Sequence, residues 1–393
     1  MDNTQIIKSA IFGVAIGDAL GVPVEFTSRA ERKADPVTGM RSYGTHNQPA
    51  GTWSDDSSMM FATMDSMIES DDIDYDDMMK RFSKWRYEGD YTPWRVLFDI
   101  GVTCNKAIAQ YRPGCNPLKC GGIGDRDNGN GSLMRIMPAS LYVSFVPFLR
   151  TESPEKGMRI VSSISSLTHA HLRSRLGCVI HALICREMII EKESNKRSLN
   201  DILISAWERI KNYIELRKDP DYSWELRNYA FVGDPEGLRL TPEEEIRSGG
   251  YIIDTFKAAL WSLVTTSSFS ECVLKAVNLG DDTDTVGAVA GGLAGLWYGF
   301  ESIPKEWIDV LARKGWIEDL CERFEAINRF NEQIEKKPTL LRVRYIGETD
   351  ISLISGKVYN VISIEKSWYR IVDETEEDYL FSPEEFEVVS QEE

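Results

Sequence analysis

A segment of small residues near residue 290 most constrains how this chain can fold. Residues 279–299 read LGDDTDTVGAVAGGLAGLWYG. After the acidic start, the uncharged part is rich in small residues, among them Gly287, Ala288, Gly291, Gly292, Ala294 and Gly295. Small side chains let a helix backbone approach its neighbours closely. The pattern therefore predicts a helix in the middle of a helical core, packed tightly against other helices.

Acidic and hydroxyl side chains stand at the start of this helix and of one other. One group is Asp282, Asp284 and Thr285, and the other is Ser54, Asp55 and Asp56, which precede the apolar run Met59–Ile68. Ser and Asp are common helix caps, because their oxygens satisfy free N–H groups and suit the positive end of the helix dipole. Capping needs one oxygen per helix start, however, and each group offers several.

A divalent cation is the simplest means of neutralising these two groups if they meet in the fold. Two carboxylates about 4 Å apart repel by about 4 kcal/mol at an effective dielectric of about 20. Both groups offer hard oxygen donors and contain no His or Cys, which favours Mg²⁺, Mn²⁺ or Ca²⁺ over zinc. A carboxylate shared between two ions would give a two-metal site.

Apolar periodicity predicts that residues 1 to about 335 are helical almost throughout. The helices expected are Ile6–Leu20, Ser57–Glu69, Met158–Ser166, Leu176–Glu191, Ile202–Leu216 and Tyr251–Val264, with long loops at Tyr111–Gly131 and Arg217–Arg247. Strands and helices do not alternate, which argues against a parallel α/β sheet.

The pattern changes near residue 336, at the sequence EKKP. Beyond it, LLRVRYIG, KVYNVISIE, WYRIVDE and DYLFS show the period-2 alternation of strands rich in Val, Ile and Tyr. About five short strands in so short a segment suggest a small SH3-like barrel. We therefore expect a mainly α protein with a domain at residues 1–335 and a small SH3-like β domain at residues 338–393.

The net charge and the cysteine content indicate which partners the protein can bind and in which cellular compartment it is found. The chain has 45 Lys and Arg against 62 Asp and Glu, a net charge of −17, which argues against nucleic acid or an anionic membrane as the main partner. The N-terminus lacks the pattern of a signal peptide, and the uncharged stretch Val286–Phe300 is too short to span a bilayer. Seven cysteines without a regular pattern suit a reducing cytoplasm.

Two further motifs suggest other chemistry. Cys178, His181 and Cys185 share a helical face, as zinc ligands can, but a fourth ligand is not evident and a buried core face is the stronger interpretation. The sequence DTDTV at 282–286 matches the D-x-D-x-T/V pattern of haloacid-dehalogenase-type phosphatases, in which the motif ends a buried strand. Here it comes late in the chain and opens a helix, so the match is weak.

Six sequence blocks, in order, resemble the ADP-ribosylglycohydrolases of the dinitrogenase-reductase-activating glycohydrolase type. They are GVAIGDALGVPVEF (13–26), GTWSDDSSM (51–59), GNGSLMRIMPASL (129–141), LTHAHLRS (167–174), GYIIDTFKAALW (250–261) and NLGDDTDTVGAVAGGLAGLWYG (278–299). The similarity covers most of residues 5–330. It implies an orthogonal all-α bundle that binds two Mg²⁺ ions, for which Mn²⁺ can substitute. It also implies hydrolysis of the C1″ glycosidic bond between ADP-ribose and an acceptor, commonly a protein arginine, by a water that the two ions activate.

The resemblance also implies which residues form the site. The metal ligands by position are Ser54, Asp55, Asp56, Asp282, Asp284 and Thr285, with Ser54 where the family often has Thr. The candidates for proton transfer are Asp55, Asp56, Asp99 and Glu25. Without the resemblance, Glu25 would be a solvated loop carboxylate and Asp99 a surface charge within a helix.

The substrate would contact a second set of residues. Asn130, Gly131 and Ser132 resemble the loop that cradles the ADP-ribose phosphates, and a Gly-rich turn before a helix start also offers free N–H groups to anions. His169 could hydrogen-bond phosphate or ribose, or be a buried structural histidine. Tyr251 could stack on adenine, or be a core residue.

Two other functions stay open at this stage. One is a non-catalytic ADP-ribose-binding family member, and the other is a different metal-dependent hydrolase such as a phosphatase. The expected partner is an ADP-ribosylated protein or a small ADP-ribosyl substrate. The C-terminal barrel could bind a partner protein or pack on the bundle.

Overall fold

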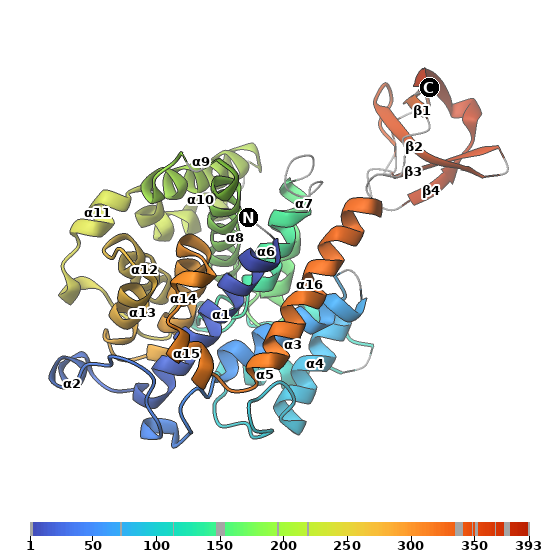
Figure 1. The fold of residues 1–393 in the computed structure, drawn as a ribbon. Helices are drawn as coiled ribbons and strands as arrows, with labels where there is room; N and C mark the ends of the chain where they lie inside the picture. The colour runs from blue at the N-terminus through green and yellow to red at the C-terminus, as the bar shows by residue number, and fades with distance from the viewer. Residues whose placement is uncertain are drawn as a thin grey trace. The chain divides into compact units, whose positions relative to one another are not determined.

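A computed structural model describes residues 3–70, 73–112, 114–146, 154–194, 196–217, 220–334, 341–347, 349, 353–365, 367–372 and 378–391. The chain forms two compact units, Met1–Asn328 and Arg329–Glu393 (Figure 1). The first unit is helical, and the second contains a small β-sheet. The boundary predicted near residue 336 lies outside the described residues.

Helices are the main secondary structure of the first unit, and loops and short 3₁₀ turns connect them. The described helices are α1 (Asn3–Gly21), α2 (Arg29–Ala34), α3 (Asp55–Ser70), α4 (Tyr75–Glu88), α5 (Val102–Gln110), α6 (Met137–Phe145), α7 (Pro154–Ser166), α8 (Leu172–Ser194), α9 (Leu199–Arg217), α10 (Pro220–Leu226), α11 (Pro235–Leu240), α12 (Ile252–Val264), α13 (Phe269–Val277), α14 (Thr283–Tyr298), α15 (Lys305–Val310) and α16 (Lys314–Ile334). The six helices predicted from periodicity are all present.

The long loop predicted at Arg217–Arg247 is wrong. This segment contains α10, a 3₁₀ helix at Arg227–Gly233, and α11. Asp234 caps α11 by accepting a hydrogen bond from the backbone N–H of Gly237 at 2.9 Å, and Pro235 follows it as the first helical residue. Helices as short as these show too few turns for apolar periodicity to reveal them.

The Gly/Ala helix α14 packs antiparallel against α1 at the centre of the helical unit. A Cβ atom on Gly13 would lie 2.2 Å from the carbonyl oxygen of Gly291, and one on Gly17 would lie 1.9 Å from that of Gly287. The two backbones therefore touch where only glycine fits. The close neighbour that the sequence required is α1, whose own glycines recur every four residues. Figure 1 shows the two helices side by side.

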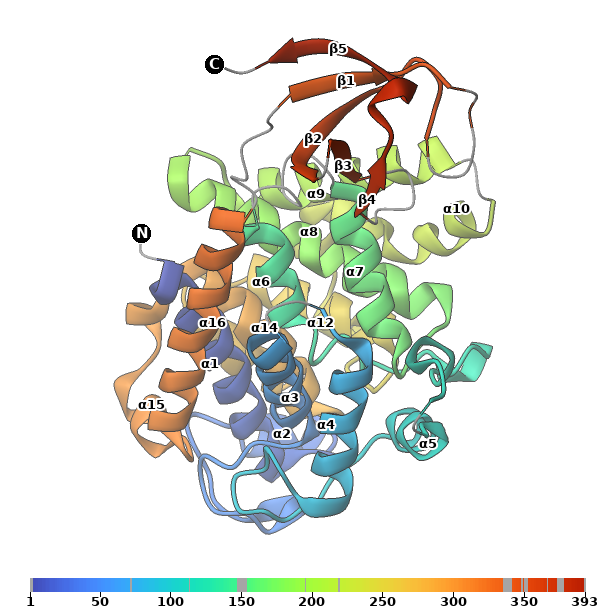
Figure 2. The same ribbon diagram turned by 90° about the vertical axis from the view of Figure 1, so that its right-hand side faces the viewer.

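Helix α1 is buried on its other sides as well. Lys8 donates a hydrogen bond to Glu322 of α16 at 2.8 Å, and Figure 2 shows α16 running alongside α1. The stretch Asn3–Val24 is long and apolar enough to cross a membrane by length and composition alone, and 94% of its most apolar window is buried inside the structure. A core helix of this kind passes the same test.

The second unit holds one antiparallel sheet of five strands (Figure 2). The strands are β1 (Leu341–Tyr345), β2 (Val358–Glu365), β3 (Trp368–Val372), β4 (Asp378–Phe381) and β5 (Phe386–Gln391), in the order β4-β3-β2-β1-β5. Val343, Val361 and Ile371 form its fully buried core. In the described strands, the edges β4 and β5 do not pair with each other. The sheet is therefore open, and the predicted closed SH3-like barrel is not confirmed.

Candidate active site

The two acidic groups meet where α3 and α14 begin. Thr285 donates a hydrogen bond from Oγ1 to Oδ2 of Asp56 at 3.3 Å, and Ser54 donates from Oγ to the same oxygen at 2.9 Å. One carboxylate oxygen is thus shared by groups 229 residues apart in the chain. The convergence that a cation site requires is present in the fold.

A buried aspartate of α1, Asp18, holds the start of α3 in place. Its Oδ1 accepts the backbone N–H of Ser54 at 2.9 Å. Its Oδ2 accepts the backbone N–H and the hydroxyl of Ser57 at 3.0 and 2.6 Å. Asp18 therefore caps α3 from a neighbouring helix. Asp18 was not predicted as a site residue, although a lone acid within the apolar stretch GVAIGDALG was a usable signal.

The carboxylates of this cluster are buried and repel one another. Asp55, Asp56 and Asp284 are at most 6% exposed. Burial, followed by neighbouring carboxylates, raises their pKa values well above the ordinary range. Burial also raises the pKa of Asp18 to about 6. Within the described residues, no Lys or Arg forms an ion pair with any of them.

Two buried oxygens mark the place where a cation fits. Asp56 Oδ1 and Asp284 Oδ2 are buried and have no hydrogen-bond partner in the described structure. Unpaired buried carboxylate oxygens are costly unless something positive lies between them. Asp18, Asp56 and Asp284 each place one oxygen within 4.8 Å of the others. These hard donors suit Mg²⁺ or Mn²⁺, so the residues present fit the metal that the sequence implied.

Asp282 connects the acidic cluster to the predicted phosphate loop. Its Oδ2 accepts a hydrogen bond from Nδ2 of Asn130 at 2.8 Å. The same amide donates to Thr255 of α12 at 2.9 Å. Burial raises the pKa of Asp282. The Nδ2 group of Asn130 therefore connects the loop to the acidic cluster and to α12, and contact of Asn130 with substrate stays a prediction.

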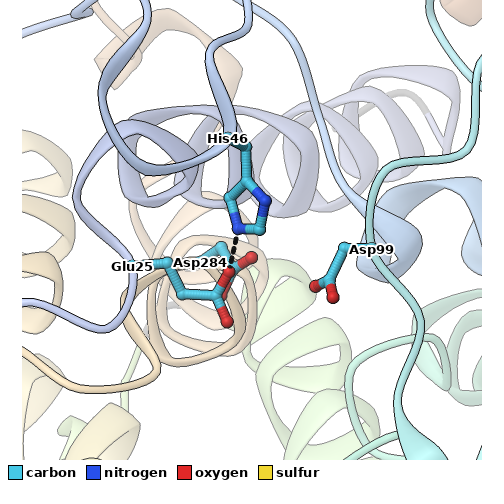
Figure 3. Close-up of side chains that lie close together, drawn as sticks. All are labelled: Glu25, His46, Asp99 and Asp284. Carbon is cyan, nitrogen blue, oxygen red and sulfur yellow. Dashed lines mark hydrogen bonds and ion pairs between the residues drawn. The ribbon is translucent and has the colours of Figure 1, made fainter.

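Glu25, His46, Asp99 and Asp284 form a second polar cluster beside the first (Figure 3). Glu25 is 5% exposed and accepts a hydrogen bond at Oε2 from Nε2 of His46. Burial raises the pKa of Glu25 to about 7, and the bond to Glu25 raises the pKa of His46. Glu25 is therefore not the solvated loop carboxylate that residues alone suggested.

Asp99 reaches this cluster from the irregular segment before α5, not from the interior of a helix. Its carboxylate faces the space between His46, Glu25 and Asp284 in Figure 3. His46 itself was missed, because its loop, GTHNQ, has no periodicity and no motif that marks it. Asp281, beside Asp282, is exposed.

The loop at Asn130–Ser132 offers its backbone to an anion. Within the described residues, no acceptor is recorded for the backbone N–H groups of Gly131 and Ser132. The hydroxyl of Ser132 is fully buried and accepts a hydrogen bond from Ser165 at 3.0 Å. Free N–H groups in such a turn can bind an anion, and the predicted phosphate contact of this loop stays a prediction.

His169 lies directly beneath this loop. A Cβ atom on Gly131 would lie 2.9 Å from Cε1 of His169. His169 is 2% exposed, its Nδ1 lies 3.0 Å from the hydroxyl of Thr168, and burial lowers its pKa to about 3. The neutral imidazole therefore packs against the loop, and a hydrogen bond from His169 to substrate stays a prediction.

Tyr251 is placed at the rim of the site. It is 37% exposed, precedes the first residue of α12, and forms a bridge with Gly129 of the phosphate loop. The guanidinium of Arg173 lies 5.9 Å from the centroid of its ring. The ring is therefore not a core residue, and it is available to a planar ligand.

The two competing motifs do not form sites of their own. Cys178, His181 and Cys185 are buried in α8, and His181 Nδ1 lies 3.0 Å from the hydroxyl of Ser140. In the part of the chain that the structure describes, these residues belong to no metal-binding group. The DTDTV motif opens a helix and does not end a strand, so the structural context of the phosphatase motif is missing.

The fold and the site are those of a helical protein with a buried cluster of carboxylates that could hold a cation. Comparison with known proteins identifies the family. A profile of the ADP-ribosylglycohydrolase family matches residues 2–335. The chain therefore belongs to the ADP-ribosylglycohydrolase family and is a glycosidic-bond hydrolase. The resemblance inferred from the six sequence blocks is confirmed.

Individual relatives agree with this assignment. The chain is 30% identical over 325 residues to the ADP-ribosylarginine hydrolase Tri1 of Serratia proteamaculans, covering 80% of this chain and 78% of the relative. It is 26% identical over 314 residues to the ADP-ribosyl-(dinitrogen reductase) glycohydrolase of Rhodospirillum rubrum, covering 78% and 90%. A solved structure described as an ADP-ribosylglycohydrolase-related protein complex matches with a TM-score of 0.65 at 25% identity, covering 83% of this chain and 99% of that one.

Proposed function

We propose that this enzyme removes ADP-ribose from an acceptor, a protein arginine in the first instance, by Mg²⁺-dependent hydrolysis of the C1″ glycosidic bond. The observation that carries the proposal is the meeting of two acidic helix starts with buried, unpartnered oxygens on Asp56 and Asp284. A relative that matches most of the chain is named an ADP-ribosylarginine hydrolase, which supports arginine as the acceptor.

Two Mg²⁺ ions, for which Mn²⁺ can substitute, would be held by oxygens from both helix starts. The proposed ligands are Ser54, Asp55, Asp56, Asp282, Asp284 and Thr285. When bound, the ions neutralise the carboxylates, orient the ribose hydroxyls and lower the pKa of a water. Asp284 belongs to both polar clusters and is placed to be shared between the two positions.

The protein's own groups would handle the proton and the developing charge. Glu25, with a pKa raised to about 7, is poised to exchange a proton near neutral pH. Asp55, Asp56 and Asp99 are the other candidates for this role. Breaking the C1″ bond passes through a cationic sugar ring, which the surrounding carboxylates stabilise because their positions are fixed before reaction.

The substrate would lie across the rim of the site. The backbone N–H groups of Gly131 and Ser132 face no protein acceptor in the described structure, and they would bind a phosphate of ADP-ribose. Tyr251 would offer its exposed ring to adenine. Asn130 and His169 would keep the loop in position.

The experiment compares three substrates with one enzyme. An arginine-linked ADP-ribosyl peptide, a serine-linked one and a generic phosphoester are incubated with Mg²⁺ and with chelator. The proposal expects release of ADP-ribose from the arginine-linked peptide in Mg²⁺ alone. Cleavage of the phosphoester would favour a phosphatase, and binding of ADP-ribose without turnover would favour a non-catalytic family member.

The C-terminal strands are proposed to be a separate small domain, residues 338–393, of SH3-like type, following a catalytic domain at residues 1–335. A partner protein is its proposed ligand. Cytoplasmic location is proposed because all seven cysteines are free thiols, which a reducing compartment maintains. Removal of residues 336–393 should leave hydrolysis of a small substrate intact, since every proposed ligand lies before residue 286.

A further inference from the structure

One nitrogen donor stands among the carboxylates of the second cluster. His46, Glu25, Asp99 and Asp284 each place one potential ligand atom within 4.8 Å of all the others. Two ligands of one ion lie at most about 4.4 Å apart when each bond is about 2.2 Å long. An ion at the centre of this group would therefore draw these four ligand atoms somewhat closer together.

The loop that carries His46 is built to aim its imidazole at this point. Tyr43, Gly44 and Asn47 adopt left-handed backbone angles, with φ of 68°, 70° and 53°. Residues in this region persist only where the surroundings hold them. Tyr43 and Gln48 close the loop through a β-bridge.

Two aromatic rings and one hydrogen bond hold the imidazole and its partner. The His46 ring lies 5.1 Å from the ring of Phe98 and 5.9 Å from that of Phe26, centroid to centroid. The hydroxyl of Thr45 donates to the carbonyl oxygen of Glu25 at 2.7 Å. His46 and Glu25 are thus fixed together and face Asp284 and Asp99, as Figure 3 shows.

One carboxylate oxygen of Asp284 has no partner in this cluster. Asp284 is 1% exposed, and its Oδ2 has no hydrogen-bond partner in the described structure. The neighbouring group of Asp18, Asp56 and Asp284 offers only oxygens. The two clusters therefore share one carboxylate but differ in donor chemistry.

We propose that Nε2 of His46 gives up its proton to solvent and exchanges its hydrogen bond to Glu25 for a bond to the ion at one of the two metal positions, and that this position prefers Mn²⁺ to Mg²⁺. The proposal rests on the metal centre of the proposed function and adds a ligand to it. Mg²⁺ demands oxygen donors in a near-ideal octahedron, whereas imidazole favours first-row transition metals. The other metal position, next to Asp18, Asp56 and Asp284, offers only oxygen donors and should not prefer Mn²⁺ to Mg²⁺.

Pulsed EPR on the Mn²⁺-loaded full chain tests this directly. A coordinated imidazole gives a ¹⁴N coupling to Mn²⁺, and labelling with ¹⁵N-histidine changes it without altering the protein. The proposal expects this coupling in the wild type. His46→Gln should abolish it, while His171→Gln, on a half-buried histidine that is not part of the site, should retain it.

Competition between ions gives a second measurement. Removing an imidazole ligand should lower the affinity for Mn²⁺ roughly tenfold or more, since even residues that only support ligands contribute that much. The Mg²⁺ concentration that displaces Mn²⁺ should fall accordingly in His46→Gln and stay unchanged in His171→Gln.

The outcomes separate this inference from the proposed function. If Mn²⁺ binds the wild type without nitrogen coupling, and ¹⁵N-histidine changes nothing, His46 only anchors Glu25 and the inference is overturned while hydrolysis can stand. If nitrogen coupling is present but no ADP-ribosyl bond is cleaved, the ligand assignment holds and the proposed function fails. The labelled wild type decides the point even if His46→Gln does not fold.

Discussion

Replacing Gly17 with alanine tests whether the α1–α14 contact determines both stability and the site. The added Cβ would lie 1.9 Å from the carbonyl oxygen of Gly287 and 2.4 Å from its carbonyl carbon. Both are backbone atoms and cannot rotate away. Restoring an ordinary contact of about 3.4 Å requires the two helices to separate by roughly 1.5 Å.

The cost follows from this displacement. Overpacking a well-filled core typically costs about 1–3 kcal/mol, and we expect the upper end because the clash is between backbones. For a unit of this size, each kcal/mol lowers the melting temperature by roughly 2 °C, so Gly17→Ala should lose about 6 °C. Asp18 follows Gly17, and Asp284 lies three residues before Gly287, so affinity for Mg²⁺ should fall as well.

The matched control is Gly315→Ala in α16, where an added Cβ meets nothing within 4 Å. This change should be neutral or stabilise by up to about 1 kcal/mol, because alanine restricts the unfolded chain. Differential scanning calorimetry with and without Mg²⁺ measures both effects. Equal melting temperatures for the two variants would refute the proposed close contact.

Three further predictions concern the acidic cluster. Saturating Mg²⁺, at about 100 times its Kd, should stabilise the fold by about 2.7 kcal/mol and raise the melting temperature. Asp282→Asn should reduce this rise. An equal rise with NaCl of matched ionic strength would show that screening of charge causes it. Asp55→Ala or Asp284→Ala should lower kcat at least about 100-fold in a folded protein, and near-normal turnover would remove these residues from the site. Because the pKa of Asp18 is raised to about 6 in the fold, its proton favours the folded state. Asp18 alone should therefore lower the metal-free free energy of unfolding by about 3 kcal/mol as pH rises from about 4 past 6. Asp18→Asn should remove this part of the slope in urea titrations and leave the part that Asp55, Asp56 and Asp284 contribute; an unchanged slope would contradict the prediction.

The helices and the acidic groups were predictable because their signals are local. Apolar periodicity over three or more turns identified α1, α3 and α12. Ser54, Asp55 and Asp284 were found because several carboxylates and hydroxyls stand together at helix starts, beyond what capping needs. The repulsion among the carboxylates suggested that the two acidic groups meet around a cation. The structure shows the contact between them, from Thr285 to Asp56.

The residues that were missed act over long distances. Asp18 is a single acid in an apolar helix, and its role appears only when α1 lies against the start of α3. His46 becomes significant only because its loop folds back on Glu25. The glycines of α1 are needed because they lie opposite those of α14 and let the two backbones approach closely. Each of these contacts depends on packing between distant segments, which no local pattern encodes.

The C-terminal sheet illustrates a different limit. Alternation predicted strands such as Val358–Glu365, and five are present. Closure depends on pairing between the first and last edges, and alternation within a strand says nothing about that. Irregular register between β1 and β5, at Arg342 and Val343, also has no visible sequence signal.

We propose that the starts of α3 and α14 together hold two divalent ions. Anomalous diffraction from crystals of the protein soaked in Mn²⁺ tests it most directly, because the ions are located without reference to activity. We expect two peaks in the anomalous difference map, one beside Asp56 and one beside Glu25, with Asp284 between them. Crystals that bind Mn²⁺ only elsewhere, with no peak at these carboxylates, would contradict it.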